Sequence, residues 1–352
     1  MTPKYMVPIA FFCLLVALPI GLFISARAQK PSTKPQNQKE PAQTSYCISG
    51  PYTHKNLTIF LVHGKDLMPG KSFLTLQEAL AQKKVRVYET KDVNELAIRN
   101  LSNQDVYVQA GDIVRGGEQD RMISIDFIVP PRSGRMPIAA FCVESGRWSK
   151  RGEEQAGWFS SSENVAATKE LKLAAKSANS QEAVWQNVST AQAKLSRNVA
   201  EIVNVSASPT SYELSVENAK VKETTAAYIN ALGKVLRNKP DVIGYAFAIN
   251  GKVNSADVYA SHALFAKLWP KLLKATATEA LAELDQNAKA EPVADEMIHA
   301  FLAESEQPKP KTKEVTQRVR VVTREDDQNI FFETQDRSQK DAWVHRNYIR
   351  KQ

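Results

Sequence analysis

The stretch 122–129, Met-Ile-Ser-Ile-Asp-Phe-Ile-Val, carries an apolar side chain at every second position, namely Ile123, Ile125, Phe127 and Val129. Side chains at alternate positions of a β-strand point to opposite faces of the sheet. The spacing therefore predicts one half-buried strand over 122–129, and it favours an antiparallel sheet around that strand.

Further short β-friendly runs lie on both sides of this stretch, at 57–62, 85–89, 95–99, 106–109 and 138–144. Turn signals rich in Gly, Pro, Ser and Asn separate most of them. Thr75, with Glu78 three residues later, has the pattern of a helix capping box. From about 46 to 148 the chain is therefore predicted to be mainly antiparallel β, as a sheet or a sandwich.

The composition changes after Trp158, where Ala, Lys, Glu, Gln and Asn dominate. Apolar residues then recur at helical spacing, at positions 184, 188, 191 and 195. Asn250-Gly251 stands between two apolar runs, which is the strongest short signal for a β-hairpin. A helix is expected over 262–284, with Pro270 kinking or breaking it.

The expected fold class is therefore α+β. Residues 46–305 form the main domain, β-rich over 46–148 and helical with a hairpin over 149–305. Residues 306–352 form a linker and a C-terminal β element, with strands predicted at 315–322, 330–333 and 343–349.

The first 28 residues have the pattern of an export signal, with positive charge at the start, an apolar run over 6–24 and small residues at Ala26 and Ala28. We therefore expect an exported protein, secreted or periplasmic. The alternative is a retained membrane anchor over 6–24, because about 19 apolar residues span a bilayer. Residues 29–45 lack large apolar side chains and are expected to be a disordered tether.

The 352 residues, 43% hydrophobic and 24% charged, are typical of a globular protein with a sizeable core. The formal net charge is +8, but the basic residues are scattered and no basic stripe alternates with aromatic residues. Nucleic-acid binding is therefore not expected. The histidines lie far apart without zinc-ligand spacing, so no metal is expected, and no cofactor is indicated.

Two cysteines, Cys47 and Cys142, remain after the predicted signal. In an oxidising compartment they form either a disulfide or two independent thiols, and the sequence leaves both outcomes open.

The densest polar cluster lies in 112–121 and is followed by a second polar group in 144–148. Antiparallel pairing of the two adjoining strands places Arg121 near Glu144. Arginine binds carboxylates and phosphates, glutamine binds amide edges, and tryptophan stacks on flat rings. The candidate ligand-binding residues are therefore Arg115, Gln119, Arg121, Arg147 and Trp148.

Two carboxylates in this cluster, Glu118 and Glu144, are candidates for an acid and base pair if the site raises one pKa. The structural alternative is a buried network of Arg and Glu that fixes the hairpin, with Gly116 and Gly117 needed only for the turn.

The segments 85–89, 111–121 and 142–148 together resemble the domain family associated with ADP-ribosylglycohydrolases and rhodanese-like phosphatases. The hairpin with its following helix and the segments around Thr334 and His345 are similar as well. The resemblance covers most of the chain after the tether. It implies a shared fold and a link to NAD or ADP-ribose metabolism, without an established reaction.

The sequence thus favours a binding or accessory module for a small anionic or nucleotide-like ligand or for a protein partner. One alternative is a hydrolase that acts on an ADP-ribose-like or glycosidic bond through Glu118 and Glu144. Another is a structural protein of the cell envelope.

Overall fold

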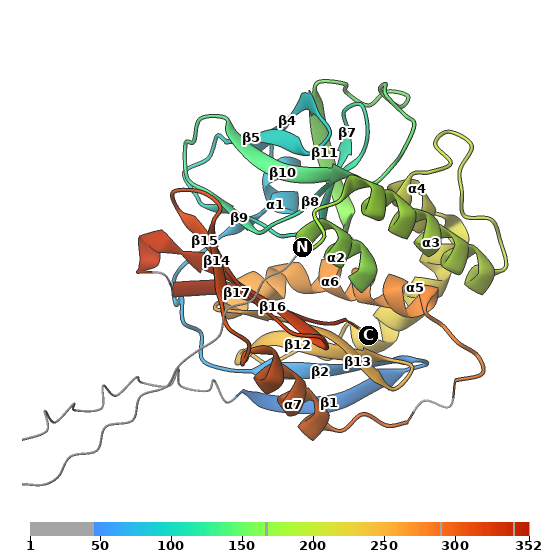
Figure 1. Cartoon of the computed structure of the whole chain (residues 1–352), viewed down its shortest axis with the longest axis vertical. Helices are drawn as coiled ribbons and strands as arrows, with labels where there is room; N and C mark the ends of the chain where they lie inside the picture. Colours follow the sequence, from blue (N-terminus) through green and yellow to red (C-terminus); the bar gives the residue numbers. More distant parts are fainter. Residues whose placement is uncertain (1–45, 166–167, 289–290, 341, 352) are drawn as a thin grey trace, which may run out of the picture. The chain divides into compact units, whose positions relative to one another are not determined.

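The computed structural model describes residues 46–165, 168–288, 291–340 and 342–351, and they form a mixed α+β structure (Figure 1). The predicted export signal and tether lie outside the described residues. Within the described ranges no helix is both long enough and apolar enough to cross a membrane.

An eight-stranded antiparallel sheet draws strands from both ends of this part of the chain. Its strands, in spatial order, are β1 (Cys47–His54), β2 (Leu57–His63), β12 (Val242–Ile249), β13 (Lys252–Tyr259), β17 (Ala342–Arg350), β16 (Asn329–Asp336), β15 (Val319–Glu325) and β14 (Lys311–Glu314). The predicted C-terminal strands therefore extend the same sheet that β1 and β2 begin.

A closed six-stranded barrel forms the rest of the β structure, together with a small three-stranded sheet. The barrel order is β10 (Met136–Cys142), β5 (Glu95–Asn100), β4 (Val85–Asp92), β11 (Trp158–Val165), β7 (Asp112–Gly116) and β8 (Arg121–Ile123). The small sheet contains β3 (Leu74–Thr75), β6 (Val106–Val108) and β9 (Phe127–Val129). The antiparallel sheet or sandwich predicted over 46–148 is thus divided among the large sheet, the small sheet and a closed barrel. Closure of the barrel removes exposed strand edges there.

Helices cover both faces of the large sheet (Figure 1). The apolar residues of α5 (Ala219–Leu232) and α6 (His262–Ala282) pack on one face, and those of α7 (Asp295–Ser305) pack on the other. The remaining helices are α1 (Leu76–Ala81), α2 (Lys169–Lys176), α3 (Gln181–Val199) and α4 (Tyr212–Val216). Apolar residues of α2, α3 and α4 form one hydrophobic core with barrel residues such as Phe141.

Several local predictions are confirmed. The Thr75 side chain accepts from the Glu78 amide and Glu78 reaches back to the Thr75 amide, so the capping box is present. The Asn-Gly hairpin joins β12 to β13. Helix α6 contains Pro270 and continues through it to Ala282.

The predicted single strand over 122–129 is wrong. It is two strands, β8 and β9, that belong to different sheets, and the residues between them leave both ladders. The carboxylate of Asp126 points into the protein, where its Oδ1 accepts the Ala110 amide at 2.8 Å. Both faces of this stretch are buried, so the alternation did not mark a solvent side.

The helical assignment after Trp158 is wrong for residues 158–165, which form β11. Phe159, Ser162 and Val165 of this strand are buried, and Phe159 packs in the barrel core. The disulfide alternative is also not realised, because Cys47 is an exposed thiol in the large sheet and Cys142 a buried thiol in the barrel.

A buried chain of three ionisable groups, here called the His345 clasp, links the barrel side of the structure to the large sheet. His345 Nδ1 lies 2.7 Å from Asp126 Oδ2, and its Nε2 lies 3.0 Å from Asp257 Oδ1. Thr334 donates to Asp126, and the imidazole stacks on Tyr259 with ring centroids 4.4 Å apart. The clasp therefore joins the β8–β9 connection to strands β13, β16 and β17.

We predict that His345→Ala lowers the free energy of unfolding by about 3–5 kcal/mol, because it leaves two buried carboxylates without their shared partner. Urea denaturation measures this loss. His299→Ala, an exposed histidine on α7, is the matched control and is expected to change little. Equal effects of the two substitutions would contradict the role of the clasp.

The His345 clasp also makes the free energy of unfolding depend on pH. Burial by itself lowers the pKa of His345, but Asp126 and Asp257 outweigh it and raise that pKa above 6.5. This stabilisation is complete below the unfolded pKa and is lost as the pH rises through the folded pKa. Burial by itself raises the pKa of Asp126, yet His345 holds it well below 3.8, so the aspartate contribution is lost as the pH falls through its folded pKa.

The free energy of unfolding is therefore expected to be highest between these two limits. Urea titrations at a series of pH values should show the alkaline decline in the natural chain and a weaker decline in His345→Gln. A decline of the same size in both proteins would show that another group causes it.

Candidate functional site

The candidate site lies at the end of the barrel where β7 pairs with β11, with Ser160 opposite Arg115 and Phe159 opposite Gly116. A tight turn after β7 requires glycine at Gly117, whose φ is +58°. A Cβ there would lie 2.4 Å from the Phe159 ring. The turn thus packs directly on β11, which brings the 112–121 cluster beside the loop 143–157.

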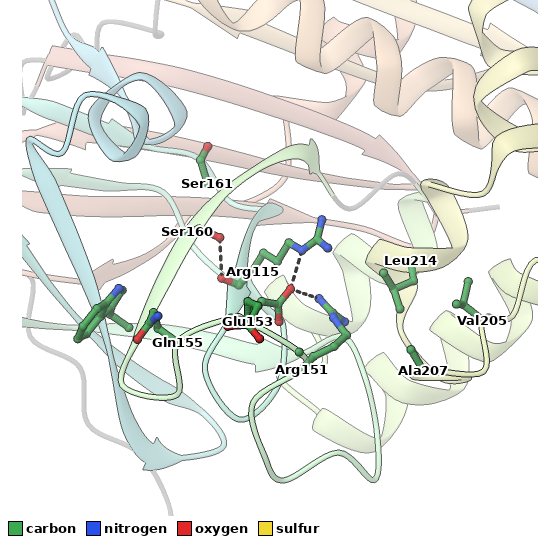
Figure 2. Close-up of a pocket in the computed structure, with 12 residues that line it drawn as sticks. Arg115, Arg151, Glu153, Gln155, Ser160, Ser161, Val205, Ala207 and Leu214 are labelled. Carbon is green, nitrogen blue, oxygen red and sulfur yellow. Dashed lines mark hydrogen bonds and ion pairs between the residues drawn. The ribbon is translucent and has the colours of Figure 1, made fainter.

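Two arginines meet at one carboxylate in this region (Figure 2). Arg115 Nε and Arg151 Nη2 each donate to Glu154 Oε1 at 2.8 Å. Arg115 Nη1 also donates to Glu217 Oε2 at 3.1 Å, and Arg151 Nη1 donates to Asp120 Oδ2 at 3.0 Å. These bonds fix both guanidinium groups in place.

Behind them lies a buried carboxylate, Glu144, with no exposed surface. Its oxygens accept from the Arg147 guanidinium, from Ser208 Oγ at 2.6 Å and from the Asp120 amide at 3.1 Å. Every lone pair needed to stabilise the charge has a donor, so Glu144 is a structural anchor for the loop that carries Arg147 and Arg151.

The neighbouring carboxylates differ in their pKa. Burial raises the pKa of Glu144, but hydrogen bonds from Arg147 and Ser208 outweigh it and hold the pKa below its usual value. For Asp120 the pKa is raised, because burial and the charge of Glu144 outweigh the contribution of Arg151. Glu144 therefore stays ionised, and it is poorly suited to be a proton donor near neutral pH.

A cleft of about 710 Å³ opens beside this network. We call it the Arg115 cleft. Figure 2 shows Arg115 and Arg151 on one side of it, facing Val205, Ala207 and Leu214. The other residues that line it are Gly152, Glu153, Glu154, Gln155, Trp158, Ser160 and Ser161. Its volume is in the range typical of small-molecule sites.

Trp158 is the aromatic residue of the Arg115 cleft, with 45% of its surface exposed. The Arg86 guanidinium lies over its ring, 5.5 Å from the centroid. Trp148, the predicted aromatic residue, is 54% exposed and does not line the cleft.

The structure brings together only part of the predicted set. Arg115 lines the cleft, and Arg147 lies behind it against Glu144. Arg121 follows the predicted strand register, opposite Cys142, but its guanidinium bonds to Glu89 and not to Glu144. The predicted strand pairing is therefore present, but the Arg121 guanidinium does not join Glu144 in one pocket.

The remaining two predicted residues do not line the Arg115 cleft. Gln119 is completely buried, and neither polar atom of its amide has a hydrogen-bond partner within the described residues. Glu118 is half-buried, and its backbone amide donates to Glu89 Oε2 at 3.3 Å.

The sequence model of the ARG and Rhodanese-Phosphatase-superfamily-associated Protein domain, ARPP-1, matches residues 45–349. The chain belongs to the ARPP-1 family. This confirms the resemblance inferred from the sequence. No curated protein and no solved structure matches the chain.

The match to ARPP-1 includes the barrel, the large sheet and every residue of the Arg115 cleft. The sequence did not identify three polar residues of this site, namely Arg151, Glu154 and Glu217. The i, i+3 spacing of Arg151 and Glu154 was a usable signal. Glu217 had none, because it lies 102 positions from Arg115 at the end of α4.

We predict that Arg121→Ala destabilises the ARPP-1 domain by about 3–5 kcal/mol, because Glu89 then loses its partner inside the protein. The two side chains are only 1% and 4% exposed. Arg115→Ala, at the partly exposed edge of its network, is expected to cost less than about 1 kcal/mol. Thermal and urea denaturation distinguish them, and an Arg121 variant as stable as the Arg115 variant would contradict this assignment.

Proposed function

We propose that this ARPP-1 domain is a binding module for a nucleotide-like ligand with an anionic group, held in the Arg115 cleft. The observation that carries the proposal is the presence, at one cleft of suitable size, of an exposed arginine edge, an exposed aromatic side chain and a carboxylate oxygen without a partner among the described residues. These are the three kinds of group that a nucleotide needs.

The arginine edge belongs to Arg115. Its Nε and Nη1 are used by Glu154 and Glu217, whereas Nη2 donates no hydrogen bond among the described residues. The side chain is 32% exposed and lines the cleft. Two N–H groups are thus free for a phosphate or carboxylate, on a guanidinium that is already oriented.

The carboxylate oxygen belongs to Glu154. Its Oε1 accepts one hydrogen bond from each arginine, but the buried Oε2 has no partner among the described residues. A buried acceptor without a donor is costly, and a shift of the Glu154 side chain toward the cleft on binding would let a ligand hydroxyl satisfy it. Ribose-like hydroxyl groups are donors of this kind.

The charges at the cleft limit the class of ligand. Glu153 and Glu154 line the cleft together with two arginines, and Glu217 pairs with Arg115. The cleft therefore does not have the strongly positive field of a site for a highly charged anion. A ligand that presents hydroxyl donors as well as an anionic group matches this mixture. The family name, which records association with ADP-ribosylglycohydrolases, supports ADP-ribose as the first probe.

The hydrolase alternative receives less support. Glu144 is buried, ionised and saturated with donors, so it has no free oxygen for a glycosidic bond. The export proposed for this chain rests on residues 1–28 alone. A structural role in the envelope is the conclusion that remains if no ligand binds.

We expect isothermal titration calorimetry to show binding of ADP-ribose, or of AMP or NAD, to the full-length protein. Arg115→Ala should weaken it by about 10-fold or more, since a hydrogen bond to a charged group contributes about 1.5–3 kcal/mol. Trp158→Ala should weaken it as well, through lost stacking.

Arg132→Ala, an exposed arginine outside the cleft, is the matched control and should bind as the natural chain does. Equal affinities in the natural chain and the Arg115 variant, or no binding by any probe, would contradict the proposal.

A further inference from the structure

A second constellation lies away from the Arg115 cleft, on the large sheet. Ser49 Oγ is 2.7 Å from His63 Nε2, and His63 Nδ1 is 2.9 Å from Asp241 Oδ2. A serine, a histidine and an aspartate are thus connected in line through the two ring nitrogens. This is the order of contacts by which hydrolases activate a serine.

The sheet register fixes this arrangement. Ser49 lies in β1, the first strand of the sheet, and Cys47 is the residue paired with His63 at the end of β2. Val242 pairs with His63 from the other side, which places Asp241 next to the ring. Two adjacent strands, β1 and β2, and the residue that directly precedes β12 therefore contribute one residue each.

Ser49 is partly exposed, and it precedes Gly50, which is exposed. The ladder between β1 and β2 shifts between Ser49 and Tyr52, so the strand is irregular just after the serine. Bulges of this kind often redirect a side chain beside a functional site.

The hydrogen bonds determine which nitrogen carries the proton. The bond with His63 lowers the pKa of the exposed Asp241, so its carboxylate is ionised and can only accept. His63 Nδ1 must then be the donor, and in the neutral ring Nε2 is the acceptor. Nε2 faces Ser49 Oγ, so the hydroxyl donates to the nitrogen that would take its proton.

The surroundings indicate the class of substrate. Lys239 donates to the Tyr52 hydroxyl at 2.6 Å, and this hydrogen bond lowers the pKa of Tyr52. Lys239 also lines a pocket of about 420 Å³, next in sequence to Pro240 and Asp241. This pocket contains Lys234 and Arg237 as well, and no carboxylate is among the described residues that line it.

We infer that Ser49, His63 and Asp241 form a nucleophilic site for acyl transfer from esters that carry a negative charge. Ser49 Oγ bonds to the ester carbonyl carbon while His63 Nε2 takes the hydroxyl proton. The bond from that carbon to the alkoxy oxygen then breaks, and His63 returns the proton to the leaving alcohol. Water, activated by the same nitrogen, releases the acid and restores Ser49.

In this site Ser49 and His63 are the catalytic residues, and Asp241 is a positioning residue that keeps the proton on Nδ1. Ser49, His63 and Asp241 lie outside the Arg115 cleft. A negative result for ligand binding in the cleft therefore leaves this site untouched, and the reverse also holds.

The test treats the full-length protein with a fluorophosphonate probe and locates the modified residue by peptide mass spectrometry. We expect modification of Ser49, its loss in Ser49→Ala, and a decrease of about 100-fold or more in rate for His63→Ala, the size typical of a lost general base. Thr53→Ala removes an exposed hydroxyl on the same strand, whose hydrogen-bond partner among the described residues is Thr58, and it should leave the rate unchanged.

A second measurement separates positioning from folding. Hydrolysis of an anionic aryl ester should fall in Asp241→Asn and recover in part in Asp241→Glu, with the melting temperature unchanged in both because Asp241 is exposed. The inference is overturned if Ser49 is not modified in the folded protein, or if its rate of modification is the same in His63→Ala.

Discussion

The His345 clasp is the interaction on which the arrangement of the two β systems depends. An imidazole that bridges two buried carboxylates has two hydrogen bonds and two opposite charges within reach, so its desolvation is offset on both sides. A second buried ion pair acts in the same direction. Lys271 Nζ of α6 donates to Asp112 Oδ1 at 2.8 Å, at the first residue of β7.

These two contacts have a direct consequence for the candidate site. Asp112 begins the strand that carries Arg115, so the ion pair with α6 fixes where that strand starts. The site is thus positioned by charges buried in the core, whereas its own arginines are held by carboxylates at its edge. A rigid core with a polar, partly open edge is the arrangement expected of a pre-formed binding site.

The fold could be predicted from the sequence where the signal was local. The capping box, the Asn-Gly hairpin and helix α6 each depend on residues that are close in the chain, and all three are confirmed. Strand β11 was missed because its serines and Glu163 carry no apolar alternation. Its partners in the barrel, β7 and β4, determine that it is a strand.

Of the predicted ligand-binding residues, Arg115 alone lines the Arg115 cleft. The 112–121 cluster does lie beside the loop after β10, because strand pairing follows from the pattern. Side-chain partners do not follow in the same way: Arg121 turns to Glu89, 32 positions away, and Asp126 meets His345 across 219 positions. No local pattern encodes such contacts, so the clasp could not be found before the structure.

Hydrogen–deuterium exchange with and without ADP-ribose tests most directly whether the Arg115 cleft holds the ligand. We predict slower exchange in 113–117 and in 149–161 when the ligand is present, with the large sheet unchanged. Exchange that is unaltered in both segments, or that slows equally in Arg115→Ala, would contradict it.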